Sequence, residues 1–335
     1  MADSAVNQDN LSIPLIDFSP FLSGEPEAKA AAAHEVLSGF QNAGFIYLKN
    51  HGISQNIVKR IFGQSAAFFD RPQEAKDALE WYSARANRGY TAHGREKVSQ
   101  LATKEEVEAL KAAVPDLKES LEIGRDDEEG CPNMWPTDEE GKVFREQMME
   151  FFEECKKLHM QVMRAIAVGL GIDEGWFDGY TDRGDNTLRL LHYPAVKKEV
   201  FEKNKNQVRA GEHTDYGSIT LLFQDQRGGL QVQSPKGTFV DATPIEGTIV
   251  VNAGDLLARW SNDSIKSTKH RVVEPPLKPE SGDTYPARYS IAYFCNPNFN
   301  RAIEVIPGTY ADAAEKKYSA VNSGEYLVQR LSVTY

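Results

Sequence analysis

The sequence predicts a mixed α+β protein in which a mainly helical N-terminal half, residues 1–180, precedes a β-rich core at 181–300. Helical patterns dominate before residue 180. After Gly184, seven short β-rich runs follow within about 110 residues, which favours a sandwich, a barrel or a jelly roll. A C-terminal extension, 301–335, is expected to be helical from residue 309 and to pack on the core. No stretch has the composition of a flexible linker, so we expect one structural body.

The first elements follow from local pattern. The alternating stretch SIPLIDFS, residues 12–19, and the β-rich GFIYLKNHG, residues 44–52, predict two strands. Helix-forming composition predicts helices over 26–42, 54–69 and 72–83. Three less regular stretches follow: NRGYTAHGREKV at 87–98 predicts a loop, 104–122 is compatible with helix or loop, and DDEEGCPNMWP at 126–136 predicts an acidic turn.

The longest helical pattern begins near Thr137, which with Glu140 forms a capping box. It ends in the glycine-containing region Gly169–Gly171. An apolar stripe at helical spacing is interpreted as core rather than as a cofactor site; it consists of Met148, Phe151, Phe152, Cys155, Leu158 and Val162.

The β core is predicted from runs separated by Gly, Pro, Asn and Asp. In order they are TLRLLHYP, SITLLFQD, GLQVQ, TFVDATP, TIVVNAGD, HRVVEPP and RYSIAYF. Such a series of short strands is typical of a closed or two-layered β architecture.

Charge and composition exclude several classes of function. The chain of 335 residues is 41% hydrophobic and 26% charged, as in soluble globular proteins, and its net charge of −11 disfavours nucleic acid and anionic membranes as partners. Three cysteines without a CxxC pair argue against a disulfide framework and for a reducing compartment. We find no signal peptide, no run of 18 apolar residues, and no GxGxxG, P-loop or GxSxG motif. A cytoplasmic monomer is expected.

Three residues of the β core have the composition of a metal site. His213 and Asp215 lie two apart, and His270 begins a later β-rich run. Residues two apart on a strand point the same way, so the first two could reach one ion. Two histidines and one carboxylate form a facial triad that leaves positions open, which suits iron(II) and oxygen chemistry. His213 and Asp215 alone are a weak motif that chance or an ordinary strand would also explain.

A second pair strengthens this interpretation. Arg288 and Ser290 are also two apart in a predicted strand, eighteen residues after His270. A guanidinium matches a carboxylate with two parallel hydrogen bonds, and a serine adds a donor. Such a pair could bind the distal carboxylate of a dicarboxylate whose other end is bound to a nearby metal.

Taken together, these motifs resemble the iron(II)- and 2-oxoglutarate-dependent dioxygenases of the isopenicillin N synthase-like group. IPLIDFS and GFIYLKNHGI resemble that group's N-terminal region, and LRLLHYP, HTDYGSITLLFQD, GGLQV, NAGDLL and STKHRV resemble its catalytic core. The resemblance covers most of the chain. It implies a double-stranded β-helix (jelly-roll) core flanked by helices.

The resemblance also implies residue roles. His213, Asp215 and His270 would ligate iron(II), and Arg288, Ser290 and Tyr193 would bind 2-oxoglutarate. Two departures are visible: Leu191 stands where many plant members have Asn, and the insert PPLKPESGDTYPA lengthens the spacing before Arg288.

The implied activity uses iron(II), 2-oxoglutarate and O2, releases succinate and CO2, and oxidises a small-molecule substrate in specialised metabolism, with ascorbate supporting activity in vitro. Hydroxylation is the default outcome; desaturation, ring expansion and cyclisation stay open. The alternatives are an oxidase that needs no 2-oxoglutarate, an ethylene-forming enzyme and a non-catalytic binder.

The substrate itself is not identified by the sequence, but three residues are candidates for contact with it. Arg189 would share the inner face of its strand with Leu191 and Tyr193 and could bind an acidic group of the substrate, or pair with an acid of the protein. Tyr90 and Phe294 are predicted pocket walls. His192 would face the other way and be structural.

Overall fold

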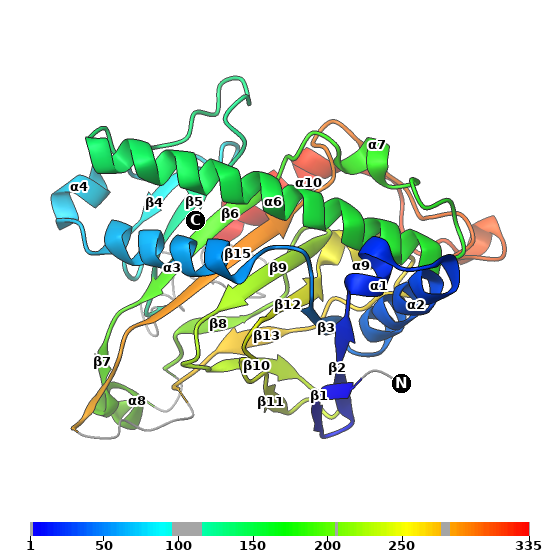
Figure 1. Ribbon diagram of the computed structural model, residues 1–335, viewed down its shortest axis with the longest axis horizontal. Helices are drawn as coiled ribbons and strands as arrows, with labels where there is room; N and C mark the ends of the chain where they lie inside the picture. The colour runs from blue at the N-terminus through cyan, green and yellow to red at the C-terminus, as the bar shows by residue number, and fades with distance from the viewer. Residues whose placement is uncertain (1–2, 96–115, 205–206, 276–281, 335) are drawn as a thin grey trace.

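The computed structural model describes residues 3–95, 116–204, 207–275 and 282–334. Two sheets face each other, and helices cover the outer face of the larger one (Figure 1). In sheet order, the nine-stranded sheet consists of β1 (Asp3–Gln8), β2 (Leu11–Asp17), β3 (Phe45–Lys49), β12 (Thr248–Ala253), β9 (Ile219–Gln224), β15 (Arg288–Cys295), β6 (Thr187–Tyr193), β5 (Glu119–Ile123) and β4 (Gly89–Thr91).

The smaller sheet completes the jelly roll. Its four strands, in order, are β11 (Phe239–Asp241), β10 (Leu230–Gln233), β13 (His270–Val272) and β8 (Ala210–His213). Two short ribbons lie outside it: β7 (Val196–Lys197) pairs with β14 (Thr284–Tyr285), and β16 (Ala302–Ile303) pairs with β17 (Val321–Asn322). The second of the two facing sheets therefore comes entirely from the predicted β core.

Within the described residues the helices are α1 (Ser19–Ser23), α2 (Pro26–Asn42), α3 (Gln55–Phe69), α4 (Gln73–Asp77), α6 (Glu139–Gly169), α7 (Asp178–Thr181), α8 (Lys198–Lys203), α9 (Asp255–Trp260) and α10 (Ser323–Thr334), with one 3-10 turn at Ala313–Glu315. The long helix α6 crosses the outer face of the large sheet beside α3 and packs against α2 (Figure 1). No helix of the described residues is long and apolar enough to cross a membrane.

The core between α6 and the sheet is mainly apolar. All six residues of the predicted stripe on α6 are buried, so its interpretation as core is confirmed. They meet the outward side chains of the sheet strands, among them Leu190 of β6 and Ile291 of β15. Burial of this much apolar surface is the main stabilising term for the helix layer.

The N-terminal half mixes strands with helices, so the prediction that it is mainly helical is not confirmed. It supplies β1 to β5, which extend the nine-stranded sheet at both of its edges. The predicted loop at 87–98 contains β4. The stretch 104–122 ends in β5, and the part of this stretch at 104–115 lies outside the described residues. Both strands form because distant segments offer hydrogen-bond partners: β5 pairs with β6 on one side and β4 on the other.

Three boundaries also differ from the prediction. The helix expected at 72–83 ends at Asp77, and the helix expected from residue 309 begins only at Ser323. The long helix is capped by Asp138 rather than Thr137: its carboxylate accepts the backbone N–H of Gly141 at 2.7 Å. An aspartate at this position is as good a cap as threonine, and it lies one residue closer to the helix.

Candidate metal centre and cosubstrate cavity

The inner face of the large sheet carries the polar residues of the site. Along β6 the side chains of Arg189, Leu191 and Tyr193 all line one internal cavity, which agrees with the predicted alternation. On the adjacent strand β15, Arg288 lies opposite Tyr193 and Ser290 lies opposite Leu191. The strand register therefore places the predicted cosubstrate residues Tyr193, Arg288 and Ser290 next to one another on two neighbouring strands.

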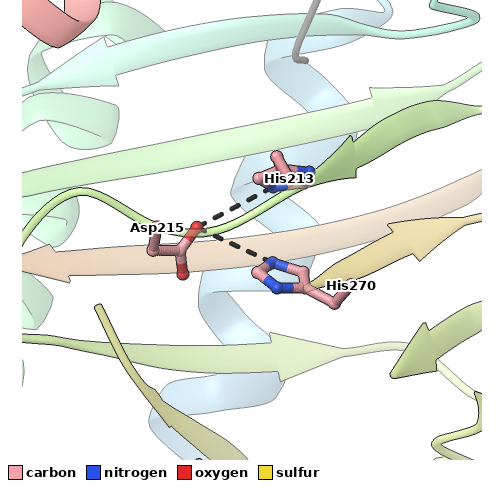
Figure 2. A group of neighbouring side chains, drawn as sticks. All are labelled: His213, Asp215 and His270. Atoms are coloured by element: carbon pink, nitrogen blue, oxygen red, sulfur yellow. Dashed lines mark ion pairs between the residues drawn. The ribbon is translucent and has the colours of Figure 1, made fainter. Parts of the chain in front are cut away.

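The small sheet supplies the metal-ligand candidates. His213 ends β8 and His270 begins β13, and the two are directly paired across these antiparallel strands, with ring centroids 4.3 Å apart. Asp215 lies in the loop after β8, so the expectation that His213 and Asp215 share one strand is wrong. The loop nevertheless turns the carboxylate back toward both rings (Figure 2).

The three side chains converge on one point. Asp215 Oδ1 lies 3.8 Å from His213 Nε2 and 3.6 Å from His270 Nε2. One ligand atom from each residue falls within 4.8 Å of the other two, a separation that a single ion can bridge. Figure 2 shows both imidazoles turned toward the carboxylate.

Neighbouring groups orient each of these donors. The Nδ1 atoms of His213 and His270 face the backbone carbonyls of Gly211 and Thr268, at 2.7 and 3.2 Å. This leaves both Nε2 atoms for a metal. Asp215 uses its other oxygen, Oδ2, to accept hydrogen bonds from Thr220 Oγ1 at 2.5 Å and Asn252 Nδ2 at 2.7 Å. Such outer contacts are what metal-ligating histidines and carboxylates usually have.

The protonation states also suit a metal. Burial, together with the nearby His270, lowers the pKa of His213 to about 3, so its imidazole is neutral at pH 7. Burial alone would raise the pKa of Asp215, but the two histidines and the two hydrogen bonds outweigh it and lower that pKa. The neutral imidazole of His213, the imidazole of His270 and the carboxylate of Asp215 fit iron(II) in a facial triad, and a bound iron would supply the activation of O2.

The cavity in front of the triad extends to Arg288. The Arg288 side chain is buried and held in place: Nε donates to the carbonyl of Gly228 at 2.9 Å and Nη1 to Ser290 Oγ at 3.2 Å. Its guanidinium also lies 4.8 Å from the centre of the Tyr193 ring. A cation fixed at the end of a cavity that begins at the metal site is suited to a dicarboxylate.

The insert before Arg288 does not displace it. Residues 276–281 lie outside the described residues, and the last part of the insert pairs with β7 through Thr284 and Tyr285. Arg288 then begins β15 in register with Tyr193.

A second cavity also borders the triad, where His213 and Asp215 line it. Arg189 and Phe294 line both cavities, and the guanidinium carbon of Arg189 lies 5.3 Å from the centre of the Phe294 ring. Arg189 Nε also lies 2.7 Å from Oε1 of the buried Glu122. Arg189 therefore both pairs with an acid of the protein and lines the cavities. The remaining walls are Asn87, Thr187, Thr214, Tyr216, Gly217, Asn296, Leu327 and Leu331.

Tyr90 does not line either cavity, which corrects its prediction as a pocket wall. Its ring is buried against Phe68, and its hydroxyl donates to Glu119 on the helix side of the sheet. Tyr90 of β4 pairs with Leu121 of β5, whose side chain is buried in the core on the helix side of the sheet, so the Tyr90 side chain points away from the site. His192 likewise faces the helix layer, where it contacts Glu119 at 2.7 Å and stacks on Tyr289, as predicted.

Several site residues escaped the sequence analysis. Lys118 and Asn252 line the cosubstrate cavity, and Leu327 and Leu331 of α10 line the second cavity. The sequence could have indicated Asn252, because it belongs to the NAGDLL motif. In the sheet, Asn252 of β12 pairs with Thr220 of β9. Lys118 and the α10 leucines carry no local signal, because long-range packing brings them to the site.

Fold and site together define an oxygenase-type metal centre inside a jelly roll, and comparison with known proteins agrees. Residues 13–138 match the family described as non-haem dioxygenase in morphine synthesis N-terminal, and residues 184–297 match the 2OG-Fe(II) oxygenase superfamily. The 2-oxoglutarate-Fe(II) type oxidoreductase ppzD of Metarhizium rileyi is 34% identical over 96% of this chain and 90% of its own.

Solved structures of a full-length protein from Neurospora crassa are more similar. Its complex with alpha-KG and thymine has 62% identity and a TM-score of 0.93, covering 99% of this chain and 100% of that one. Its complex with alpha-KG and 5-formyluracil has 58% identity and a TM-score of 0.91, covering 100% of both chains.

The chain therefore belongs to the 2OG-Fe(II) oxygenase superfamily. It is a 2-oxoglutarate-dependent iron(II) dioxygenase, an oxidoreductase that acts on a small molecule with release of succinate and CO2.

Proposed function

We propose that this dioxygenase oxidises the 5-methyl group of thymine or of a closely related free pyrimidine. The observation that carries the proposal is the near full-length likeness, at 62% identity, to the Neurospora crassa protein that was solved with thymine in its complex. The same relative was solved with 5-formyluracil, which differs from thymine only at the 5-substituent. A pocket that accepts both compounds suits stepwise oxidation at that carbon.

The proposed reaction balances with one O2 and one 2-oxoglutarate per step. In the first step the methyl group becomes a hydroxymethyl group, and 2-oxoglutarate becomes succinate and CO2. In the second step the hydroxymethyl group loses two hydrogens to become a formyl group, with one water formed alongside succinate and CO2. Both steps attack the same carbon, so one substrate orientation serves both.

The second cavity has the groups that such a substrate needs. The Phe294 ring offers a flat apolar surface for a pyrimidine ring. Asn87, Asn296 and Arg189 offer amide and guanidinium groups to the ring carbonyls and N–H groups, and Leu327 and Leu331 exclude water. Arg189 would thus recognise a carbonyl rather than the acidic substrate group expected from the sequence.

In this proposal the site residues keep the roles that the family resemblance implied. His213, Asp215 and His270 would hold iron(II), which would supply the activation of O2. Arg288 and Ser290 hold the distal carboxylate of 2-oxoglutarate, with Tyr193 beside it. The chain's own contribution is to fix these groups and to exclude water from the cavity. A monomeric state and a cytoplasmic location stay predictions.

The test is turnover with matched bases. Purified protein with iron(II), 2-oxoglutarate, ascorbate and O2 is incubated with thymine or with uracil, which lacks the methyl group. We expect thymine to stimulate succinate release, and mass spectrometry to show a product heavier by one oxygen that is later converted to the formyl compound. Equal succinate release with thymine and uracil, and no oxidised base, would exclude thymine as the substrate.

A further inference from the structure

The cosubstrate cavity contains a cation that the dioxygenase motifs do not include. Lys118 is 4% exposed and lines the cavity together with Tyr193, Arg288 and His213. Its backbone lies just before β5, in the segment that closes the gap between the two sheets. In that segment the carboxylate of Asp116 accepts the backbone N–H of Gly211 at 3.2 Å, and Leu117 N donates to Arg209 O at 3.1 Å.

The register of the large sheet places Lys118 relative to the cosubstrate residues. Glu119 of β5 pairs with His192 of β6, so the position before Glu119 falls opposite Tyr193. On its other side Tyr193 pairs with Arg288 of β15. Lys118, Tyr193 and Arg288 therefore form one row across three neighbouring chain segments, with Tyr193 in the middle.

The charges of this region favour an anion. Among the described residues that line the cavity, three side chains are cationic, Lys118, Arg189 and Arg288, against the single carboxylate of Asp215. Arg189 has the Glu122 carboxylate beside it, and Asp215 points to the metal site. The other two cations, Lys118 and Arg288, lie in one row with Tyr193 between them, so they share one end of the cavity.

A further buried arginine adds to the charge at this end. Arg209 is fully buried, and no nitrogen of its guanidinium has a hydrogen-bond partner among the described residues. Burial and the nearby Arg288 lower the pKa of Arg209 to about 10. An enclosed group of cations of this kind is stabilised when an anion binds among them.

We propose that Lys118 is a second cationic ligand of 2-oxoglutarate, which pairs with its distal carboxylate from the side of Tyr193 opposite Arg288. Arg288 and Lys118 then approach this carboxylate from two flanks, and the metal holds the other end of the molecule. In this arrangement Lys118, in the segment before β5, supplies a polar contact to the cosubstrate. It replaces the polar contact that is absent at Leu191. It concerns the cosubstrate only and does not depend on the identity of the substrate.

The test measures binding rather than turnover. The protein is loaded with manganese(II), which does not start the reaction, and is titrated calorimetrically with 2-oxoglutarate and with 2-oxopentanoate, which lacks the distal carboxylate. Lys118→Met should raise the Kd of 2-oxoglutarate at least about tenfold, the loss expected for a charge-assisted contact, and leave that of 2-oxopentanoate unchanged. Lys118→Arg should retain most of the affinity, and Lys118→Gln is a second neutral variant should the first not fold.

Lys269→Met is the matched control. Lys269 precedes the triad residue His270, but its ammonium group lies 3.5 Å from Glu212 and is partly exposed. Its loss should leave both titrations unchanged. An unaltered Kd for 2-oxoglutarate in the neutral Lys118 variants would overturn the proposal. Equal weakening of both 2-oxo acids would also overturn it, because the lysine would then act at the metal end or on the fold.

Discussion

The two faces of the nine-stranded sheet differ sharply in chemistry although they share every strand. On the outer face of β6, Leu188 and Leu190 are buried in the apolar core under α6. On the inner face of the same strand, Arg189 and Tyr193 line the cosubstrate cavity. A period of two along one strand therefore separates the residues that stabilise the fold from those that line the cavity. Substitutions on the two faces should then change different measurable properties.

The largest effect is expected at the candidate metal triad, which the small sheet holds across the cavity from this inner face. His270→Ala removes one of three ligand atoms, so iron(II) binding and succinate formation should both be lost. The melting temperature of the metal-free protein should fall only modestly, because the packing lost is the contact of the His270 ring with the rings of Phe45 and His213. Metal content by elemental analysis, succinate assays and thermal unfolding check this. Turnover that persists in this variant would remove His270 from the ligand set.

The outer face should show the opposite behaviour. Phe151 of α6 is fully buried and its ring packs edge-on against Phe223 of β9, with centroids 5.1 Å apart. Phe151→Ala should lower the free energy of unfolding by about 3–5 kcal/mol, the usual cost of such a cavity. The folded fraction should bind 2-oxoglutarate with unchanged affinity. Denaturant unfolding and calorimetry measure the two quantities, and a change in affinity alone would contradict the separation of the faces.

Arg288 tests the cosubstrate end of the inner face. Arg288→Ala should weaken 2-oxoglutarate binding at least about tenfold, because charge-assisted hydrogen bonds contribute roughly 1.5–3 kcal/mol. Titration of the manganese(II)-loaded protein gives the Kd. An unchanged Kd would place the carboxylate anchor at another residue.

Asn252 tests whether the inner face also tunes the metal indirectly. Its amide donates to Asp215 Oδ2 at 2.7 Å, and Asn252→Ala removes this contact without removing a ligand. Metal affinity should fall roughly 10–100-fold, as for other residues that orient metal ligands. A competition titration with a chelator measures it. Leu222→Ala, in the lining of the same cavity but with no hydrogen bond to the triad, is the control that should keep the metal affinity.

The smallest effect concerns a charged cluster on the outer face. Glu119 accepts hydrogen bonds from Lys76 and Tyr90 and contacts His192. Burial alone would raise its pKa, but these three partners lower it from 4.5 to about 2. A lowered carboxyl pKa stabilises the fold above about pH 4.5, and this stabilisation disappears as the pH falls toward 2.

Glu119→Gln should therefore destabilise the protein at neutral pH, and its difference from the unsubstituted protein should shrink below pH 4.5. Urea unfolding across this pH range measures the difference, and turnover should be retained. A pH-independent difference would show that the carboxylate charge contributes nothing to stability.

Local pattern predicted the elements whose cause is local. The helix Pro26–Asn42 has the predicted bounds, and the strands around IPLI, FIYL and RYSIAYF all form, because periodicity and flanking breakers act over a few residues. The short strands β4 and β5 were not predicted. They are stabilised by partners far along the chain, which no window of sequence contains.

The sequence by itself indicated the family, the jelly roll and the candidate residues for the triad and the Arg288 pair, because these are read as residue types at characteristic spacing. Only the tertiary structure decided how they meet. It put Asp215 in a loop rather than on a strand, turned Tyr90 away from the cavity, and brought Lys118 beside Tyr193. The physical reason is that strand pairing joins distant segments, and the direction of a side chain depends on a register that only the assembled sheet defines.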